Sequence, residues 1–172
     1  MQLEQVSKIV IASGSETRFA TLTGIDSTNI HILTLSKVTV GAAGGVIDLQ
    51  PTTGGSADTT NNFSITWTKM NSAGSFQNFG NATQDIMRFT DGAQAAPHSL
   101  NSIMFLYNWF DSDRYSYATQ DTVYSHGTLS GFVQGGIKSE TTSHDGVAIN
   151  TNQTGGGGFQ ADSTFVLYKV LN

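Results

Sequence analysis

The stretch FSITWTKM, residues 63–70, alternates large apolar side chains with small polar ones. In an extended chain Phe63, Ile65 and Trp67 fall on one side, and one serine and two threonines fall on the other. A period of two residues is typical of a β-strand that packs one face on a core and leaves the other in water. The stretch therefore predicts a half-buried strand of an antiparallel sheet.

Alternation of this kind recurs along the 172 residues, whereas helical periodicity of apolar residues is nearly absent. Turn-forming segments rich in Gly, Asn, Asp and Ser separate the alternating stretches at a spacing of roughly 8–15 residues. This pattern predicts an all-β fold, an antiparallel jelly-roll β-sandwich of about eight to ten strands with little or no helix. One domain over residues 1–172 is expected, in which residues 1–13 form an N-terminal arm or an edge strand.

Two stretches, SIMFLYNWF (102–110) and TFVLYKV (164–170), carry bulky apolar side chains on both faces. Such strands are predicted to be covered on both sides. Because no helices are expected, a neighbouring copy of the chain is the natural second cover, and a threefold axis is one arrangement that provides it. The candidate subunit interface consists of Phe165, Val166, Tyr168, Val170, Met104 and Leu106.

The content of charged residues and of cysteine excludes several classes of function. Charged residues make up only 12% of the chain, the eight Lys and Arg residues form no cluster, and the formal net charge is −5. Nucleic-acid binding is therefore not expected. The chain has no Cys, which excludes disulfides, thiolate metal sites and a Cys nucleophile.

The beginning of the chain holds one short apolar burst, residues 9–12. It predicts neither a Sec signal nor a membrane span. We expect a protein that is made, and that stays or assembles, in the cytoplasm.

Residues 155–158 are four consecutive glycines. A phosphate-binding loop would need a following Lys-Ser or Lys-Thr pair and a helix, and a strand pattern follows here instead. The run is therefore interpreted as a link between two strands.

Four histidines, His31, His98, His126 and His144, are scattered without the spacing of a metal-binding motif. Jelly rolls can bring distant histidines together, but isolated core or loop histidines are the simpler interpretation. No metal or other cofactor is predicted.

The densest group of acids and aromatics lies at residues 107–126. Asp111 and Asp113 could bind Ca²⁺, pair with an arginine or, as a carboxylate pair, hydrolyse a glycosidic bond. Trp109 and Tyr115 beside them could stack on a sugar, so these four residues are candidate glycan contacts. The favoured interpretation is a core strand that runs into a solvated turn, and no catalytic residue is predicted.

Three segments carry a resemblance to a known family: TRFATLTGIDSTNIHILTLSKVTVGAAGGVIDLQ (17–50), YNWFDSDRYSYATQDTVYSHG (107–127) and VAINTNQTGGGGFQADSTFVLYKV (147–170). The order of these segments resembles single-domain jelly-roll modules of tailed-phage virion proteins, which are common in marine and cyanobacterial phages. The last segment departs from the usual pattern at Lys169, where the family usually has Gly. In the middle segment, Trp109 and Phe110 follow the Asn at the place where the family usually has Pro.

The resemblance implies a virion protein that often packs as a homotrimer and has no catalytic residues. The expected function is that of a capsid decoration, or cement, protein that binds the outer shell and stabilises it, because strand pattern begins by Val6 and no stalk is expected. The expected partners are other copies of the chain, the major capsid protein or other virion proteins, and a host surface glycan. A tail-fibre component or receptor-binding module of the same fold is the first alternative, and a free carbohydrate-binding module or a hydrolase is the second.

Overall fold

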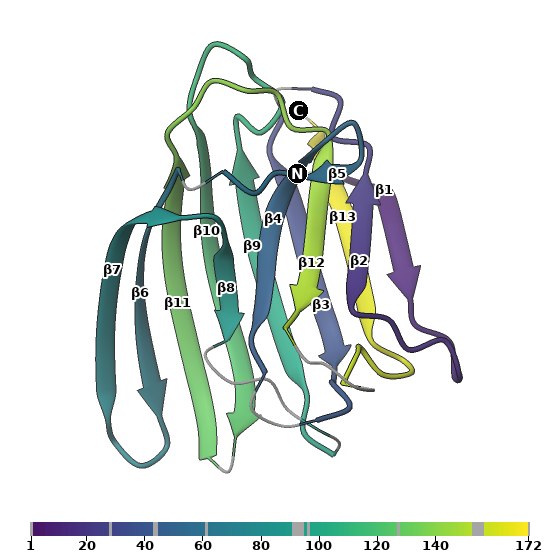
Figure 1. Cartoon of the computed structure of the whole chain (residues 1–172), viewed down its shortest axis with the longest axis vertical. Coiled ribbons are helices and arrows are strands. Elements are labelled where there is room, and N and C mark those ends of the chain that lie inside the picture. Colours follow the sequence, from purple (N-terminus) through teal and green to yellow (C-terminus); the bar gives the residue numbers. More distant parts are fainter. Residues whose placement is uncertain are drawn as a thin grey trace.

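The computed structural model of the chain describes residues 2–27, 29–42, 45–60, 62–90, 95, 97–126, 128–152 and 157–171, and of His126 only the backbone. The described residues form two antiparallel sheets that face each other, and none of them is helical (Figure 1). The predicted all-β sandwich is confirmed, whereas its jelly-roll connectivity stays a prediction.

An eight-stranded sheet and a five-stranded sheet make up the two layers. The large sheet has the order β1 (Gln2–Val10), β13 (Thr164–Leu171), β3 (His31–Val38), β9 (Leu100–Tyr107), β10 (Ser116–His126), β11 (Thr128–Lys138), β6 (Phe63–Asn71) and β7 (Phe76–Gln84). The small sheet has the order β2 (Phe19–Thr23), β12 (Gly146–Thr151), β4 (Ile47–Thr53) and β5 (Ser56–Ala57), and β8 (Met87–Thr90) also pairs with β4.

The described residues thus form thirteen strands, more than the eight to ten expected. The expected strand at 86–91 is present as β8, whereas β5 was not expected because it is too short to show an alternation. Another strand that was not expected, β7, has the sequence FQNFGNATQ, which lacks apolar alternation because the strand lies at a sheet edge and is exposed along most of its length.

The strand β6 has the orientation that its alternation predicts. Phe63 and Ile65 are buried and Trp67 packs against the core, while the intervening side chains point to the outer face. The turn that joins β6 to β7 is held by the Asn71 carboxamide, whose oxygen accepts hydrogen bonds from the backbone N–H groups of Ala73 and Ser75. Gly74 completes the turn with a φ of 82°.

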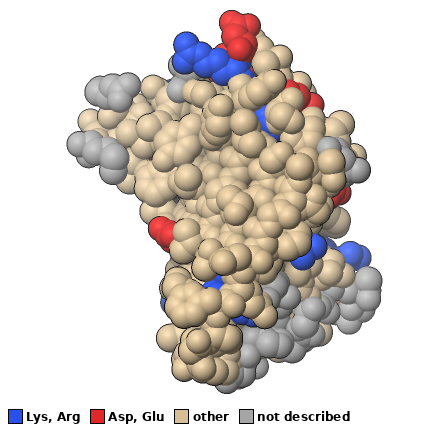
Figure 2. Space-filling view, turned by 90° about the vertical axis from the view of Figure 1, so that its left-hand side faces the viewer, with Lys and Arg blue, Asp and Glu red and all other residues tan. Residues whose placement is uncertain are grey.

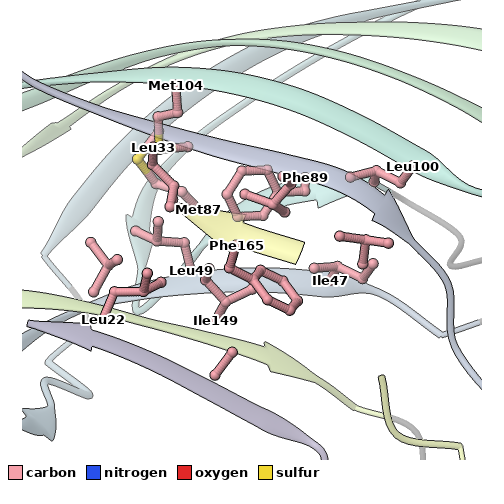
Figure 3. Close-up of a cluster of buried hydrophobic side chains, with 14 of the residues drawn as sticks. Leu22, Leu33, Ile47, Leu49, Met87, Phe89, Leu100, Met104, Ile149 and Phe165 are labelled. Atoms are coloured by element: carbon pink, nitrogen blue, oxygen red, sulfur yellow. The ribbon is translucent and has the colours of Figure 1, made fainter. Parts of the chain in front are cut away.

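The core lies between the two sheets. Leu33, Met104 and Phe165 of the large sheet point towards Leu22, Leu49 and Ile149 of the small sheet (Figure 3). All six side chains are fully buried. Each such side chain stabilises the fold by about 1.5–3 kcal/mol relative to its exposed state.

Within the described chain, β9 is covered on one face only, so its predicted second cover stays a prediction. Its side chains alternate between buried and more exposed, and 37% of Ile103 is accessible on the outer face. The five-stranded sheet covers only one face of the large sheet, and β6 and β7 extend beyond it (Figure 1). The apolar residues on the outer face of β9 therefore have no second layer within the described chain.

The strand β13 is closer to its prediction. Phe165 and Leu167 are buried in the core, and Val166 is also buried on the opposite face, where Tyr168 and Val170 are half-buried. Gln2–Val10 at the beginning of the chain is the edge strand β1, which pairs with β13. No helix in the described part of the chain is long and apolar enough to cross a membrane.

Candidate functional site

The outer face of the eight-stranded sheet, which points away from the small sheet, is the most distinctive surface of the molecule. The cross-strand register places every second residue of β9, β10, β11, β6 and β7 on it. Among these described positions Asp121 carries the only charge. Figure 2 shows the side of the molecule on which β6 and β7 lie, with its charged side chains towards the ends and margins and an uncharged middle.

One end of this face exposes a group of large apolar side chains, here called the end patch: Met70, Phe76, Val123 and Leu129. The register aligns Val123, Gly131, Met70 and Phe76 in one row across four strands. Leu129 lies two residues before Gly131 in β11 and therefore on the same face. The end patch lies near the β6–β7 and β10–β11 turns, which are together at the bottom of Figure 1. Phe76 is 70% exposed. Contiguous exposed apolar surface of this kind marks interaction sites.

Nearer the middle of the same face, the surface is hollowed around Gly135 of β11. Two adjoining hollows of about 480 and 380 Å³ share Thr66, Thr119 and Gly135 in their linings. The outer face therefore combines a protruding apolar end with a recessed centre.

The predicted subunit interface is corrected at three of its six residues. Phe165, Met104 and Leu106 point into the core, where the chain's own small sheet covers them (Figure 3 labels the first two). They cannot contact another subunit while the sandwich is intact. Val166, Tyr168 and Val170 do lie on the outer face, as the register with β1 and β3 requires.

The four candidate glycan contacts do not form one binding surface. Trp109 is only 1% exposed and meets His144 edge-on, with 6.0 Å between the ring centroids, so it cannot stack on a sugar. The Asp111 carboxylate is used within its own turn, where it accepts the Asp113 N–H at 2.8 Å and lies 3.7 Å from Arg114 Nε. Of the four, Asp113 and the exposed Tyr115 line a shallow hollow.

A buried charge cluster at the end of β11 was not foreseen from the sequence. The Lys138 side chain is fully buried, and its Nζ lies 2.8 Å from Asp58 Oδ2 and 2.6 Å from Glu140 Oε1. The same ammonium donates to Thr60 Oγ1 at 3.0 Å and to the Asn62 side-chain oxygen. The sequence does contain a signal for a buried Lys138, because this residue continues the inward-facing alternation of Phe132, Gln134 and Gly136.

The electrostatics of this cluster follow from burial and from the ammonium. Burial opposes ionisation of Asp58, but the hydrogen bonds from Lys138 and from the backbone N–H and hydroxyl of Thr60 together outweigh it and hold the pKa of the carboxyl well below its usual range. Burial, assisted by the Lys138 charge, lowers the pKa of His144 to about 4. The Asp58 carboxylate is therefore charged and the imidazole is neutral at pH 7.

Asp58, Glu140 and His144 are also the described residues that come nearest to a metal-binding set, since one donor atom from each lies within 4.8 Å of the others. However, the Lys138 ammonium already bridges the two carboxylates. The cluster is therefore best explained as an internal ion pair that closes one end of the sandwich.

The remaining histidines do not join this set. His31 is buried in β3 with Nδ1 2.9 Å from the Asn29 carbonyl oxygen, and His98 lies in a turn. The side chain of His126 lies outside the described part.

The glycine run is described only in its second half, since residues 155–156 lie outside the described residues. At Gly158 an added Cβ would come within 2.7 Å of the Thr17 carbonyl oxygen. Phe159, which follows, is fully buried and packs on Phe165 with 4.9 Å between the ring centroids. In the described part of the run, Gly158 allows two backbone segments to approach closely, and Phe159 anchors the loop to the core.

No family model, no curated protein and no solved structure matches this chain. Its functional assignment therefore depends on the geometry above and on the resemblance in pattern.

Proposed function

We propose that this chain is a non-catalytic structural protein of a tailed-phage virion, which acts by associating with copies of itself and with other virion proteins. The observation that carries this proposal is the outer face of the eight-stranded sheet, which has one charge among its described strand positions from β9 to β7 and exposes the apolar end patch there. The resemblance to jelly-roll virion modules supports the phage assignment.

A second copy of the chain is the partner that this surface fits best. The end patch has no charged member, so two copies can approach each other there without like-charge repulsion. Contact between the patches buries apolar side chains, and each Å² of apolar surface removed from water stabilises the contact by about 25 cal/mol. Three end patches that meet at a threefold axis give the homotrimer that the resemblance implies.

Within the virion, we propose a place on the outer shell as a decoration protein. A trimer offers three identical shell-binding surfaces, and once one has bound, the others act at a high effective concentration. Weak individual contacts with the major capsid protein then add up to a stable bridge between neighbouring capsomers.

Immunogold labelling of purified particles of the phage that encodes the chain tests this proposal. Antibody raised against the purified chain is expected to label intact heads evenly. Labelling of tails only would move the chain to the fibre class. Absence of the chain from purified particles, checked by mass spectrometry, would overturn the virion assignment.

A further inference from the structure

The recess around Gly135 is a trough that crosses four strands of the large sheet. The walls and the floor of this trough are formed by six residues, Thr66, Phe105, Tyr107, Tyr117, Thr119 and Gly135. A Cβ added at Gly135 would meet no atom within 4 Å. The trough is open because this one strand position carries no side chain, while both of its cross-strand neighbours, Thr66 and Thr119, do.

Aromatic rings form one wall of the trough. Tyr107 of β9 and Tyr117 of β10 lie directly opposite each other, and Phe105 stacks beside Tyr107 with 6.5 Å between the ring centroids. Tyr117 is 43% exposed, and the other two rings are half-buried. These rings offer apolar surface to a ligand with a flat apolar side.

Hydroxyl groups flank the floor. Neither the Thr66 nor the Thr119 hydroxyl has a hydrogen-bond partner within the part of the chain that the structure describes. The Asp121 carboxylate, which accepts hydrogen bonds, stands at one end of the trough. Donors and acceptors thus lie beside the aromatic wall.

This lining excludes several ligand classes. No Lys or Arg lines either hollow, so nothing there would neutralise a phosphate. The strands β9, β10, β11 and β6 are paired on both sides, so a peptide cannot add to them as a further strand. An uncharged ligand with both C–H faces and many hydroxyls matches the mixed lining.

We propose that the trough binds a neutral saccharide chain. A sugar ring lies with its C–H face on Tyr117, its hydroxyls exchange hydrogen bonds with Thr66 and Thr119, and the two adjoining hollows accommodate successive units of the chain. This function goes beyond the proposed structural role and uses residues outside the end patch. The proposed sugar contact is thereby no longer the buried Trp109 but Tyr107 and Tyr117, which belong to the same aromatic segment, together with residues of β6 and β11.

The test is affinity electrophoresis of the purified chain in native gels that contain laminarin, dextran or galactomannan, together with an array of neutral oligosaccharides. Two variants disable the trough: Gly135→Leu fills it, and Tyr117→Ala removes an exposed wall. Two matched controls leave it intact: Phe19→Ala removes a 60% exposed aromatic side chain from the small sheet, and Gly131→Ala adds a methyl group to the same strand at ordinary contact distance from Met70.

We expect the unmodified chain to bind at least one of these glycans. Both trough variants should weaken that binding by at least about tenfold, and both controls should stay within about twofold. Melting curves check that each variant is folded, and Tyr117→Ala alone decides the matter if Gly135→Leu is not. Absence of binding to every glycan, or equal binding by Tyr117→Ala and the unmodified chain, would overturn the proposal whatever the location of the chain in a virion.

Discussion

Lys138 shows how a single side chain can hold together one end of this sandwich. Its ammonium is fully removed from water and is surrounded by Asp58, Glu140, Thr60 and Asn62. Removing one member of such a group leaves the others buried without compensation, which costs more than the intact group contributes. The cluster is therefore expected to be sensitive to truncation at its centre.

The Lys138→Met substitution should lower the free energy of unfolding by about 3–5 kcal/mol, because it leaves two carboxylates without their counter-charge. Urea unfolding followed by tryptophan fluorescence measures the change. The control is Arg114→Met, which removes an exposed partner of Asp111 and should change stability by no more than about 1 kcal/mol. Equal effects of the two substitutions would contradict the account of the cluster.

A second prediction concerns Asp48 on β4 and the dependence of stability on pH. Burial raises the pKa of this carboxyl from 3.8 to about 7, and Arg88, at 3.8 Å, only partly opposes the rise. Between these two pH values the unfolded chain has released the proton and the folded chain still holds it, so the Asp48 contribution to stability falls as the pH rises.

An uncharged amide removes this dependence, so Asp48→Asn should stabilise the fold relative to the unmodified chain by at least about 1 kcal/mol near pH 8 and by less near pH 4. Asn150 is the cross-strand neighbour, and its buried side-chain oxygen has no hydrogen-bond partner among the described residues, so the new amide has an acceptor beside it. Urea titrations at the two pH values measure the difference, and a difference that does not change with pH would refute it.

At the scale of the elements, two glycines in different strands have opposite roles. Gly146 begins β12 between β2 and β4, and an added Cβ would lie 2.2 Å from the Leu22 carbonyl oxygen and 2.9 Å from Thr52 Oγ1. Gly135 in β11 has open space instead. The first glycine allows two sheet neighbours to close on the strand, and the second opens the trough.

Alanine at the two positions should therefore act in opposite directions. Gly146→Ala should destabilise the fold by about 1–3 kcal/mol, since backbone atoms must shift. Gly135→Ala should stabilise it by up to about 1 kcal/mol, because it restricts the unfolded chain and meets nothing in the folded one. Thermal unfolding of both variants decides the matter, and a loss of stability at Gly135 as large as that at Gly146 would contradict the open trough.

Several elements could be predicted from the sequence and others could not, for identifiable reasons. The alternation of Phe63, Ile65 and Trp67 predicted β6 because one face of that strand meets the core. The neighbouring β7 left no such signal, since an exposed edge strand needs no apolar face. Trp109 was a candidate sugar contact because sequence cannot tell an exposed ring from one covered by a distant loop, here that of His144. The trough was invisible for the same reason: it exists only where β9, β10, β11 and β6 lie side by side.

At the scale of the whole molecule, the two-layer arrangement explains the uncovered surface. The small sheet packs on one face of the eight-stranded sheet, so the opposite face has no second layer, and β6 and β7 also extend beyond the small sheet (Figure 1). The apolar residues on the outer face of β9, Ile103 among them, are covered by an external partner in our account. Association through such a surface should depend little on ionic strength, because Asp121 is the only charge among its described strand positions from β9 to β7.

The measurement that tests this account most directly is the native mass of the purified chain, determined by light scattering at two well-separated concentrations. The account predicts a trimer of three times 18.3 kDa for the unmodified chain. It predicts a monomer for Val123→Lys, which places a charge in the end patch, and again a trimer for Thr21→Lys, which places the same charge on the exposed face of the small sheet. A monomer of the unmodified chain at both concentrations, or a trimer that Val123→Lys leaves intact, would contradict it.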